Sequence, residues 1–544
     1  MGEAEFESKA LVEAVQGALA EIPPPSEEVS IGTPGGRFQV RWDEGGSATA
    51  LGQLAFFAEF LEVSGLFERW VACCPMAYTS PNAPAPWDVL GTWLLSILDG
   101  QRRYAHVAGL CGDAVAPQIL GMKKIVSDES LRRALAHLAP TPSPRYPEAE
   151  RLRREAQLAR SAEWMDQALA ESTREALSTD WILDCDVTVK PLYGHQDGAE
   201  ISYNPTKPGR PSHAIHTYWI ANVRLVLDAE VQEGTATATK YSLPRLIQIL
   251  VELPVGERPR LVRGDNAFGN EPVMVELEAI EQPYLFKLRL SKNVKRHIER
   301  LFRVSGWCDA GQGWEGIDST LALTGWEDKR RVVVLRRALK GEMLVAQEDN
   351  GQQLLGFIEA DRKGGKRLTG YEYAVLVTNL DHEILTLGQL YRDRADAENA
   401  FDELKNQWGW GGFTTHDLHR CQLSARGVAL IYNWWSLFVR LAKPEARLEA
   451  ITSRPWLMSS VGRRTEHAGQ TTITLTGQHA YFDKARQLLM HISSQLQAWV
   501  SAAAEQFDGP SVWLRCCAHL KRTLAAIGPP KPHRLLAEHA NGVG

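Results

Sequence analysis

The succession of expected strands and helices between residues 179 and 290 constrains the fold of this chain more than any other feature. Three segments have strand patterns and are rich in β-branched or aromatic residues: WILDCDVTVK and two within AIHTYWIANVRLVLDAEVQEG. Next, YSLPRLIQILVEL is expected to form a helix, RPRLVRGD a strand, VMVELEAI a helix and YLFKLRL a strand. Three strands followed by alternating helices and strands predict an α/β fold with a mixed sheet.

Helical and β-rich segments flank this α/β segment. Apolar residues recur at helical spacing from about residue 48 to 138, and a long mixed-charge helix is expected to follow, over residues 151–177. Ser127 is a good N-cap, and Arg132 and Arg133 in its helix suit either DNA phosphates or an ordinary packing domain. The N-terminal 45 residues suggest a flexible arm with one strand, FQVRW. Residues 291–373 have mostly β patterns, and residues 441–544 are expected to be helical.

Length, charge and cysteine spacing exclude several classes of protein. A chain of 544 residues is too long for one ordinary core, and its net charge of -6 argues against a generally basic surface without excluding a local DNA groove. The eight cysteines form no C-x-x-C pair, which favours buried free thiols over zinc ligands or disulfides. The N-terminus lacks the apolar stretch of a secretory signal, and the apolar run over residues 427–439 is too short to span a membrane. We therefore expect a cytoplasmic or nucleoid-associated protein.

Two aspartates occupy positions that suit metal-dependent chemistry. Asp186 lies in the strand LDCDVTV, and Asp265 ends the apolar strand LVRGD, where ligands gather in α/β sheets. Asp184 is the alternative to Asp186, because the two side chains share one face of the strand. A salt bridge or strand-end cap at Asp186, and an Asx turn at Asp265, are the structural alternatives.

A third acidic residue lies in the segment YRDRADAENAFDELK. Here Tyr391, Arg394, Glu398 and Lys405 have offsets of 0, 3, 7 and 14, which place all four on one helix face within an arc of about 60°. A carboxylate, two cations and a phenol on one face suit a metal ion and a phosphate backbone. A merely solvated face is the alternative, and rival acids occur at Asp393, Asp396, Asp402 and Glu403.

Together these acids predict a two-metal site. Two carboxylates on neighbouring strands and a third on a later helix can hold two divalent ions about 4 Å apart. Because the ligands are hard oxygens and no Cys/His cluster is present, the expected ions are Mg²⁺ or Mn²⁺.

With these motifs in order, the chain resembles the DDE transposases of bacterial insertion sequences, and specifically the subgroup called transposase DDE domain group 1. Its Y-x2-R-x3-E-x6-K signature is met in full by residues 391–405, and residues 184–213 and 263–269 resemble the segments around the first two acids. The resemblance covers about residues 30–440. It implies that Asp186, Asp265 and Glu398 are catalytic metal ligands and that Tyr391, Arg394 and Lys405 grip DNA.

The resemblance also implies a fold and a domain order. An RNase H-like catalytic core with a mixed sheet would be interrupted by a β-rich insertion, with helical regions at both ends. The expected order is a flexible arm (1–45), a helical DNA-binding domain (46–145), a connecting helix (146–178), the first part of the core (179–290), the insertion (291–370), the second part of the core (371–440) and a helical region for end binding or dimerisation (441–544).

Basic residues and tryptophans near the insertion are further candidates for contact with DNA. The segment FKLRLSKNVKRHIERLFR contains Lys292, Lys295 and Arg296, which suit phosphate contacts or an ordinary solvated helix. Lys287, earlier in that segment, is a candidate for the same contacts, and Lys207 and Arg210 form a second basic loop. In relatives a tryptophan of the insertion stacks on a flipped base, for which Trp307, Trp314 and Trp326 are unresolved candidates.

The implied activity is cut-and-paste DNA transposition. A homodimer would bind transposon ends and target DNA, both double-stranded, cleave at terminal inverted repeats with two Mg²⁺ or Mn²⁺ ions per active site, and join the ends to the target. The alternatives are an RNase H-like nuclease without strand transfer and a catalytically inactive, transposase-derived DNA-binding protein.

Overall fold

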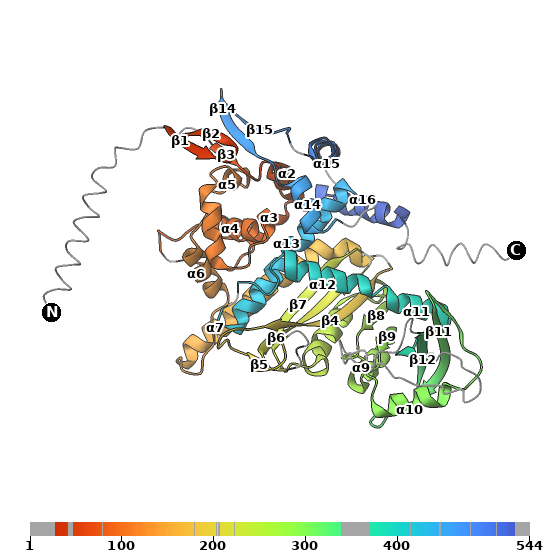
Figure 1. The fold of residues 1–544 in the computed structure, drawn as a ribbon. Coiled ribbons are helices and arrows are strands. Elements are labelled where there is room, and N and C mark those ends of the chain that lie inside the picture. The colour runs from red at the N-terminus through yellow and green to blue at the C-terminus, as the bar shows by residue number, and fades with distance from the viewer. Residues whose placement is uncertain are drawn as a thin grey trace.

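The computed structural model describes most of the chain. The described residues are 28–41, 47–78, 80–178, 180–202, 204, 207–221, 223–338, 370–413, 415–444, 448–478, 480–506 and 509–527. Figure 1 shows a large sheet with long helices lying along it, and smaller helical and β elements beyond those helices.

Ten strands form one sheet within the described residues. They are β4 (Ile182–Pro191), β5 (Glu200–Ile201), β6 (Pro211–Ile220), β7 (Leu225–Glu233), β8 (Leu261–Gly264), β9 (Tyr284–Lys287), β10 (Cys308–Gly311), β11 (Trp314–Leu321), β12 (Arg330–Ala338) and β13 (Tyr371–Thr378). The order is β10-β11-β12-β13-β9-β8-β4-β6-β5, and β7 also pairs with β6. Strands β4, β8 and β9 run parallel, whereas β6, β7 and β13 are antiparallel to their neighbours. The predicted mixed α/β architecture is therefore confirmed.

The β-rich segment extends this sheet. Strands β10, β11 and β12 continue it beyond β9, and β13 lies between β12 and β9. Residues 339–369 of the segment expected to be mostly β lie outside the described residues. The basic segment before β10 forms helix α10 (Lys292–Leu301), with Val294 and Ile298 buried on one side.

Three long helices cover the strands β4, β6 and β7. They are α7 (Glu148–Thr173), α12 (Ala395–Gln407) and α13 (Leu418–Ala442), and Figure 1 shows α12 and α13 running along the sheet. Trp219 on β6 lies 5.8 Å from Phe401 of α12 and 5.9 Å from Tyr432 of α13, measured between ring centroids. Helix α13 contains the apolar run, which is buried in the core. No helix among the described residues combines the length and the apolar character needed to cross a membrane.

The N-terminal region is helical, as predicted. Its helices are α2 (Leu54–Ser64), α3 (Leu66–Ala72), α4 (Pro86–Leu98), α5 (Ala116–Ile119) and α6 (Asp128–Leu138), with a 3₁₀ segment at Tyr104–Gly112. Ser127 caps α6 by accepting a hydrogen bond from the N–H of Ser130, which confirms the predicted N-cap. The ring of Trp70 in α3 stacks on Trp164 of α7 at 5.3 Å, so the expected connecting helix is part of the same core.

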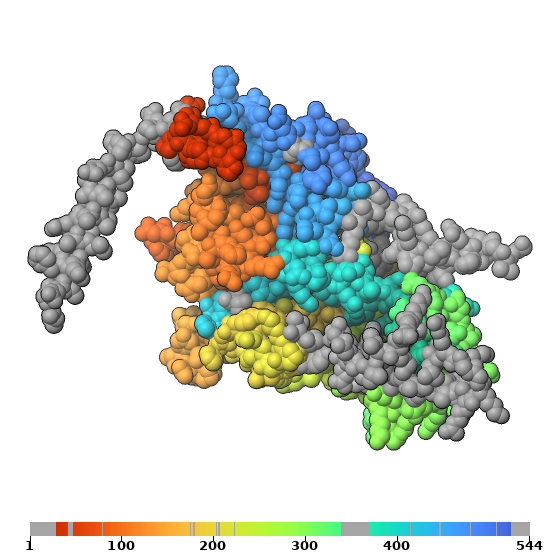
Figure 2. Space-filling view, in the orientation of Figure 1, coloured from red at the N-terminus to blue at the C-terminus, as the bar shows by residue number. Residues whose placement is uncertain are grey.

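The prediction that residues 441–544 are helical is wrong in part. Helices α14 (Ala450–Leu457), α15 (Phe482–Glu505) and α16 (Val512–Ile527) are present, but β14 (Gly462–His467) and β15 (Gln470–Leu475) form a hairpin. Its β-branched segment QTTITL favours a strand, and Ala468 and Gly469 supply the positive φ angles of the tight turn. Strand β14 also pairs with β3 (Ser47–Thr49), so the two ends of the chain share a sheet. Figure 2 shows these N-terminal and C-terminal parts side by side.

Two smaller predictions also change. The N-terminal segment forms two strands, β1 (Glu28–Thr33) and β2 (Gly36–Arg41), where one was expected. All eight cysteines are free thiols, as predicted, but Cys73, Cys111 and Cys308 are exposed rather than buried.

The remaining helices connect the strands of the large sheet. They are α8 (Leu243–Glu252), α9 (Glu271–Ala279) and α11 (Ile384–Arg392). Helix α11 follows β13 and leads directly into α12, which carries most of the signature.

Candidate active site

Strands β4 and β8 bring Asp186 and Asp265 together. These parallel strands pair Cys185 with Gly264, and each aspartate is the next residue along its own chain. Neighbouring strands lie about 4.8 Å apart, so the two side chains are adjacent, just beyond the C-terminal end of β8 and in the middle of β4. The Oδ1 atom of Asp265 accepts a hydrogen bond of 2.9 Å from the N–H of Ala267, which is the Asx turn considered as the structural alternative.

Arg394 connects Asp186 to Glu398. Its Nη2 atom donates to Oδ1 of Asp186 at 2.5 Å, and its Nη1 atom donates to Oε1 of Glu398 at 3.1 Å. The side chain of Arg394 is 4% exposed, whereas that of Glu398 is 65% exposed. One buried guanidinium, 208 residues from Asp186 in sequence, thus links the helix acid to that strand acid.

The electrostatics indicate that these groups share one site. Burial raises the pKa of Asp265, the charge of Asp186 raises it further, and Arg394 offsets part of the rise. Burial alone would lower the pKa of Arg394, but Asp186 and its other anionic neighbours raise it above its usual value. Burial also raises the pKa of Tyr391, and the charges of Asp265 and Glu398 add to that effect.

Lys287 is a basic residue of this site that the sequence suggested only as a DNA contact. It ends strand β9, the parallel neighbour of β8. Burial lowers the pKa of Lys287, while the nearby charges of Glu398 and Asp265 raise it. The usable sequence signal was its position at the end of the strand after the one that ends at Asp265, because such strand ends meet at one edge.

Asp184 has a different environment from Asp186. Both of its carboxylate oxygens accept hydrogen bonds from Arg263, at 2.6 and 2.7 Å, and the two side chains are almost fully buried. Arg263 also donates to the carbonyl oxygen of Leu390, which fixes α11 against β8. Asp184 therefore serves a buried ion pair, and Asp186 is the more accessible of the two aspartates.

The signature does not lie on one continuous helix, which corrects the projection made from the sequence. Tyr391 ends up in α11, and Arg394 precedes α12. Between the two helices, the N–H of Arg394 donates to the carbonyl oxygen of Tyr391 and that of Asp396 to Asp393, which is the tighter i→i+3 pattern. Arg394 and Glu398 still share a face, since they are four residues apart and in contact.

The other predicted DNA-binding residues lie away from the acids. Lys292 and Arg296 are exposed on α10, and Lys295 is partly buried there. Figure 1 shows α10 at the far end of the molecule, near β12. Lys405 is exposed near the C-terminal end of α12 and lines a hollow with Arg102 and Arg103.

The three tryptophans of the β-rich segment are all partly buried against the core. An arginine lies over each ring: Arg336 at 3.8 Å from Trp307, Arg337 at 4.9 Å from Trp314 and Arg330 at 5.3 Å from Trp326. These contacts give each ring a structural role.

Two further basic groups have partners inside the protein. Arg132 and Arg133 both form ion pairs with Glu129 on the surface of α6. Lys207 and Arg210 lie over the ring of Tyr193, at 4.8 and 4.6 Å from its centroid.

The acids have the donor chemistry of a magnesium site, but they are not gathered around one point. Among the described residues, no three His, Cys, Asp or Glu side chains lie close enough together to bind one metal ion. Arg394 instead lies between Asp186 and Glu398 as their common counter-ion. The carboxylates therefore fit a divalent cation by ligand type, but this conformation does not bring three of them within reach of one ion.

The comparison with protein families decides the family. Residues 37–497 match Transposase DDE domain group 1, which is most of the 544-residue chain. The chain belongs to this transposase family. The match extends beyond residue 440, where the sequence resemblance was expected to end.

Other comparisons add little to the family assignment of this transposase. The solved structures similar to it include the cryo-EM structure of the piggyBac transposase synaptic complex with hairpin DNA. The sequence identity is 12%, the match covers 90% of this chain and 88% of the other, and the TM-score of 0.36 is too low to transfer residue roles. No curated protein matches the sequence.

Proposed function

We propose that this transposase excises and reinserts DNA by a cut-and-paste mechanism, with Asp186, Asp265 and Glu398 as its catalytic residues. The observation that carries the proposal is that these acids lie near one another at the C-terminal end of β8. Asp186 and Asp265 follow paired residues of β4 and β8, and Arg394 links Asp186 to Glu398. Family membership supports the DNA substrate.

The same three carboxylates would hold two Mg²⁺ or Mn²⁺ ions. When bound, such ions activate a water or a 3′-hydroxyl and stabilise the leaving oxygen. The raised pKa of Asp265 fits this role, because a neighbouring cation favours the ionised form that burial and Asp186 disfavour.

We assign Arg394 first to positioning. Its guanidinium is buried and donates to two carboxylates, so in this conformation it orients Asp186 and Glu398 rather than facing solvent. Tyr391 would pack beside the acids at the DNA strand, and the exposed Lys405 would contact phosphate. Lys292, Lys295 and Arg296 would contact DNA farther along α10.

The proposed core is RNase H-like and consists of strands β7, β6, β4, β8 and β9 with the helices that cover them. Strands β10, β11 and β12 would belong to the insertion, and α11 and α12 would complete the core. A homodimer would hold two transposon ends and the target DNA.

Excision in cells tests this proposal. A marker flanked by the native borders of the gene is supplied with wild-type protein, Glu398→Gln or Asp402→Asn. Asp402 is the matched control because it is an exposed acid of α12 whose carboxylate accepts a hydrogen bond from Asn406 of the same helix. We expect wild type and Asp402→Asn to excise the marker and Glu398→Gln to fail.

The products separate the related activities. Joined donor and target strands support a transposase, whereas cut DNA without joined strands indicates a nuclease. Full excision by Glu398→Gln would remove that residue from the catalytic set. DNA binding by the wild type with no cleavage in Mg²⁺ or Mn²⁺ would instead support an inactive binding protein.

A further inference from the structure

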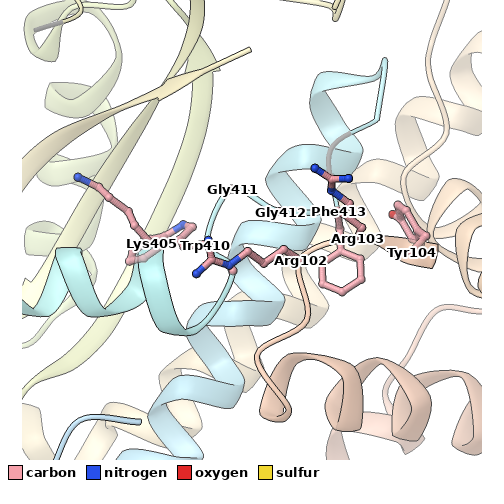
Figure 3. Close-up of a pocket in the computed structure, with 9 residues that line it drawn as sticks. Arg102, Arg103, Tyr104, Lys405, Trp410, Gly411, Gly412 and Phe413 are labelled. Carbon is pink, nitrogen blue, oxygen red and sulfur yellow. The ribbon is translucent and has the colours of Figure 1, made fainter. Parts of the chain in front are cut away.

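A hollow of about 520 Å³ opens beside the C-terminal end of α12. Its lining comes from residues 102–104 of the N-terminal region, from Lys405 at the end of the signature and from residues 409–413 of the loop after α12. Figure 3 shows Arg102 extending toward Trp410 and Lys405, with Arg103 and Tyr104 farther along the hollow. We call this site the basic hollow.

Glycines make the close approach of its two walls possible. Gly409 has a φ of +67°, and a Cβ atom there would lie 2.7 Å from the carbonyl oxygen of Gln101. A Cβ atom at Gly412 would lie 2.7 Å from the carbonyl oxygen of Arg102, and the N–H of Phe413 donates to that oxygen at 2.8 Å. The walls are therefore joined by backbone contacts before any ligand arrives.

The cations of the basic hollow have no acidic partners. Arg102, Arg103 and Lys405 form no ion pair with any described residue. Lys190, whose side chain lies behind Gly411, also has none within the described part of the chain. Elsewhere arginines such as the partly buried Arg331 and the exposed Arg337 do form ion pairs with carboxylates. Three cations without an acidic partner line one opening, which favours the binding of an anion there.

The basic hollow is aligned with the acids along α12. Lys405 follows Glu398 by seven residues, so the two side chains share a face about 10 Å apart along the helix. Lys190 likewise lies four residues beyond Asp186 on β4. A helix C-terminus favours one nearby cation, which accounts for Lys405 but not for the arginine pair.

We infer that the basic hollow binds the sugar–phosphate backbone of the DNA strand that leads away from the acidic site. This inference rests on the proposed function and extends it by assigning Arg102 and Arg103 to the same DNA strand as Glu398. Phosphates on one strand are spaced about 3.4 Å along the duplex axis, so the two sites are roughly three nucleotides apart. The N-terminal region and the catalytic region thus hold one strand together.

Salt-dependent DNA binding tests the inference. The full chain is titrated into a fluorescent 30-base-pair duplex at roughly 50 to 200 mM salt. Removing two phosphate contacts with Arg102→Ala and Arg103→Ala together is expected to lower the slope of log affinity against log salt by about 1.8 and to weaken binding roughly ten-fold at low salt. Lys405→Ala is expected to lower the slope by about 0.9.

Two matched variants control the experiment. The pair Arg102→Lys and Arg103→Lys keeps the charge and should keep the wild-type slope. The pair Arg151→Ala and Arg153→Ala removes the same charge from α7, where both arginines already form ion pairs with glutamates, and should also keep it. Thermal unfolding of each variant identifies any loss of folding. If the alanine pair does not fold, the single variants Arg102→Ala and Arg103→Ala replace it, and each is expected to lower the slope by about 0.9.

The outcomes separate this inference from the proposed function. If the wild type binds and cleaves DNA but the alanine pair at 102 and 103 keeps the full slope, the inference is wrong and the proposed function stands. The inference is also wrong if the alanine pair at 151 and 153 lowers the slope as much as the alanine pair at 102 and 103, because the loss of any two positive charges would then have the same effect. If the wild type binds no DNA, both fail.

Discussion

Two aspartates separated by one residue on β4 show how neighbouring side chains acquire different roles. Asp184 gives both oxygens to Arg263 in a nearly dry environment, whereas Asp186 is 19% exposed and gives one oxygen to Arg394. The alternation of side chains along a strand predicted that the two carboxylates share one face. It could not predict their different roles, because the partner of each comes from a distant segment. At the scale of single residues, the motif identified the acids and the fold distinguishes them.

This difference predicts opposite effects of the same substitution. Asp184→Asn leaves the buried Arg263 without its charge partner and should lower the free energy of unfolding by about 3–5 kcal/mol. Asp186→Asn should cost less stability, because the buried Arg394 keeps the partly solvated Glu398 as a charge partner, yet it should abolish DNA cleavage. Chemical denaturation and a cleavage assay measure the two effects. An unstable Asp186→Asn beside a stable, inactive Asp184→Asn would exchange the two roles.

At the scale of elements, local patterns predicted most strands and helices around the site. The strands β4, β6, β7, β8 and β9 and helices α8 and α9 all occur where their periodicity indicated. Two features escaped that reading. The break between α11 and α12 accompanies a contact of Arg394 with Asp186 on another element, and β14 pairs with a three-residue strand near the N-terminus. Both depend on contacts between residues far apart in the sequence.

The loop after α12 provides a prediction at this scale. Gly409→Ala places a side chain at a positive φ and 2.7 Å from the carbonyl oxygen of Gln101. Gly469→Ala is the matched control, because it has a φ of +78° but nothing within 4 Å of its Cβ position. Each should lose about 1 kcal/mol to the left-handed backbone, and Gly409→Ala should lose about 1–3 kcal/mol more to the clash. Equal melting temperatures would show that the two walls of the basic hollow separate easily.

The whole molecule is held together by its two ends. Leu51 forms an isolated bridge with Ser460, and β3 pairs with β14. Phe60 of α2 lies 6.5 Å from Trp513 of α16, and Glu59 accepts a hydrogen bond from Ser493 of α15. The N-terminal and C-terminal regions, which were expected to be separate, therefore share one core.

Truncation tests that shared core. A chain ending at residue 442 lacks β14, α15 and α16, so Phe60 of the N-terminal region would lose its contact with Trp513. We expect α2 to α4 to be cleaved much faster by protease than in the full chain, because apolar surface and unpaired backbone are exposed. A chain ending at residue 527 keeps every described element and serves as the control. Equal protection of α2 in both chains would contradict a shared core.

The pairing of β3 with β14 has a consequence for the order in which the protein is made. Strand β3 leaves the ribosome about 410 residues before its partner. At about 5–20 residues per second, it waits roughly 20–80 s for that partner to be synthesised. During this interval the arginines at 102 and 103 belong to a region that lacks part of its support. A ribosome that stops early thus releases a chain whose N-terminal region lacks its partner strand, so complete translation becomes a condition for the shared core.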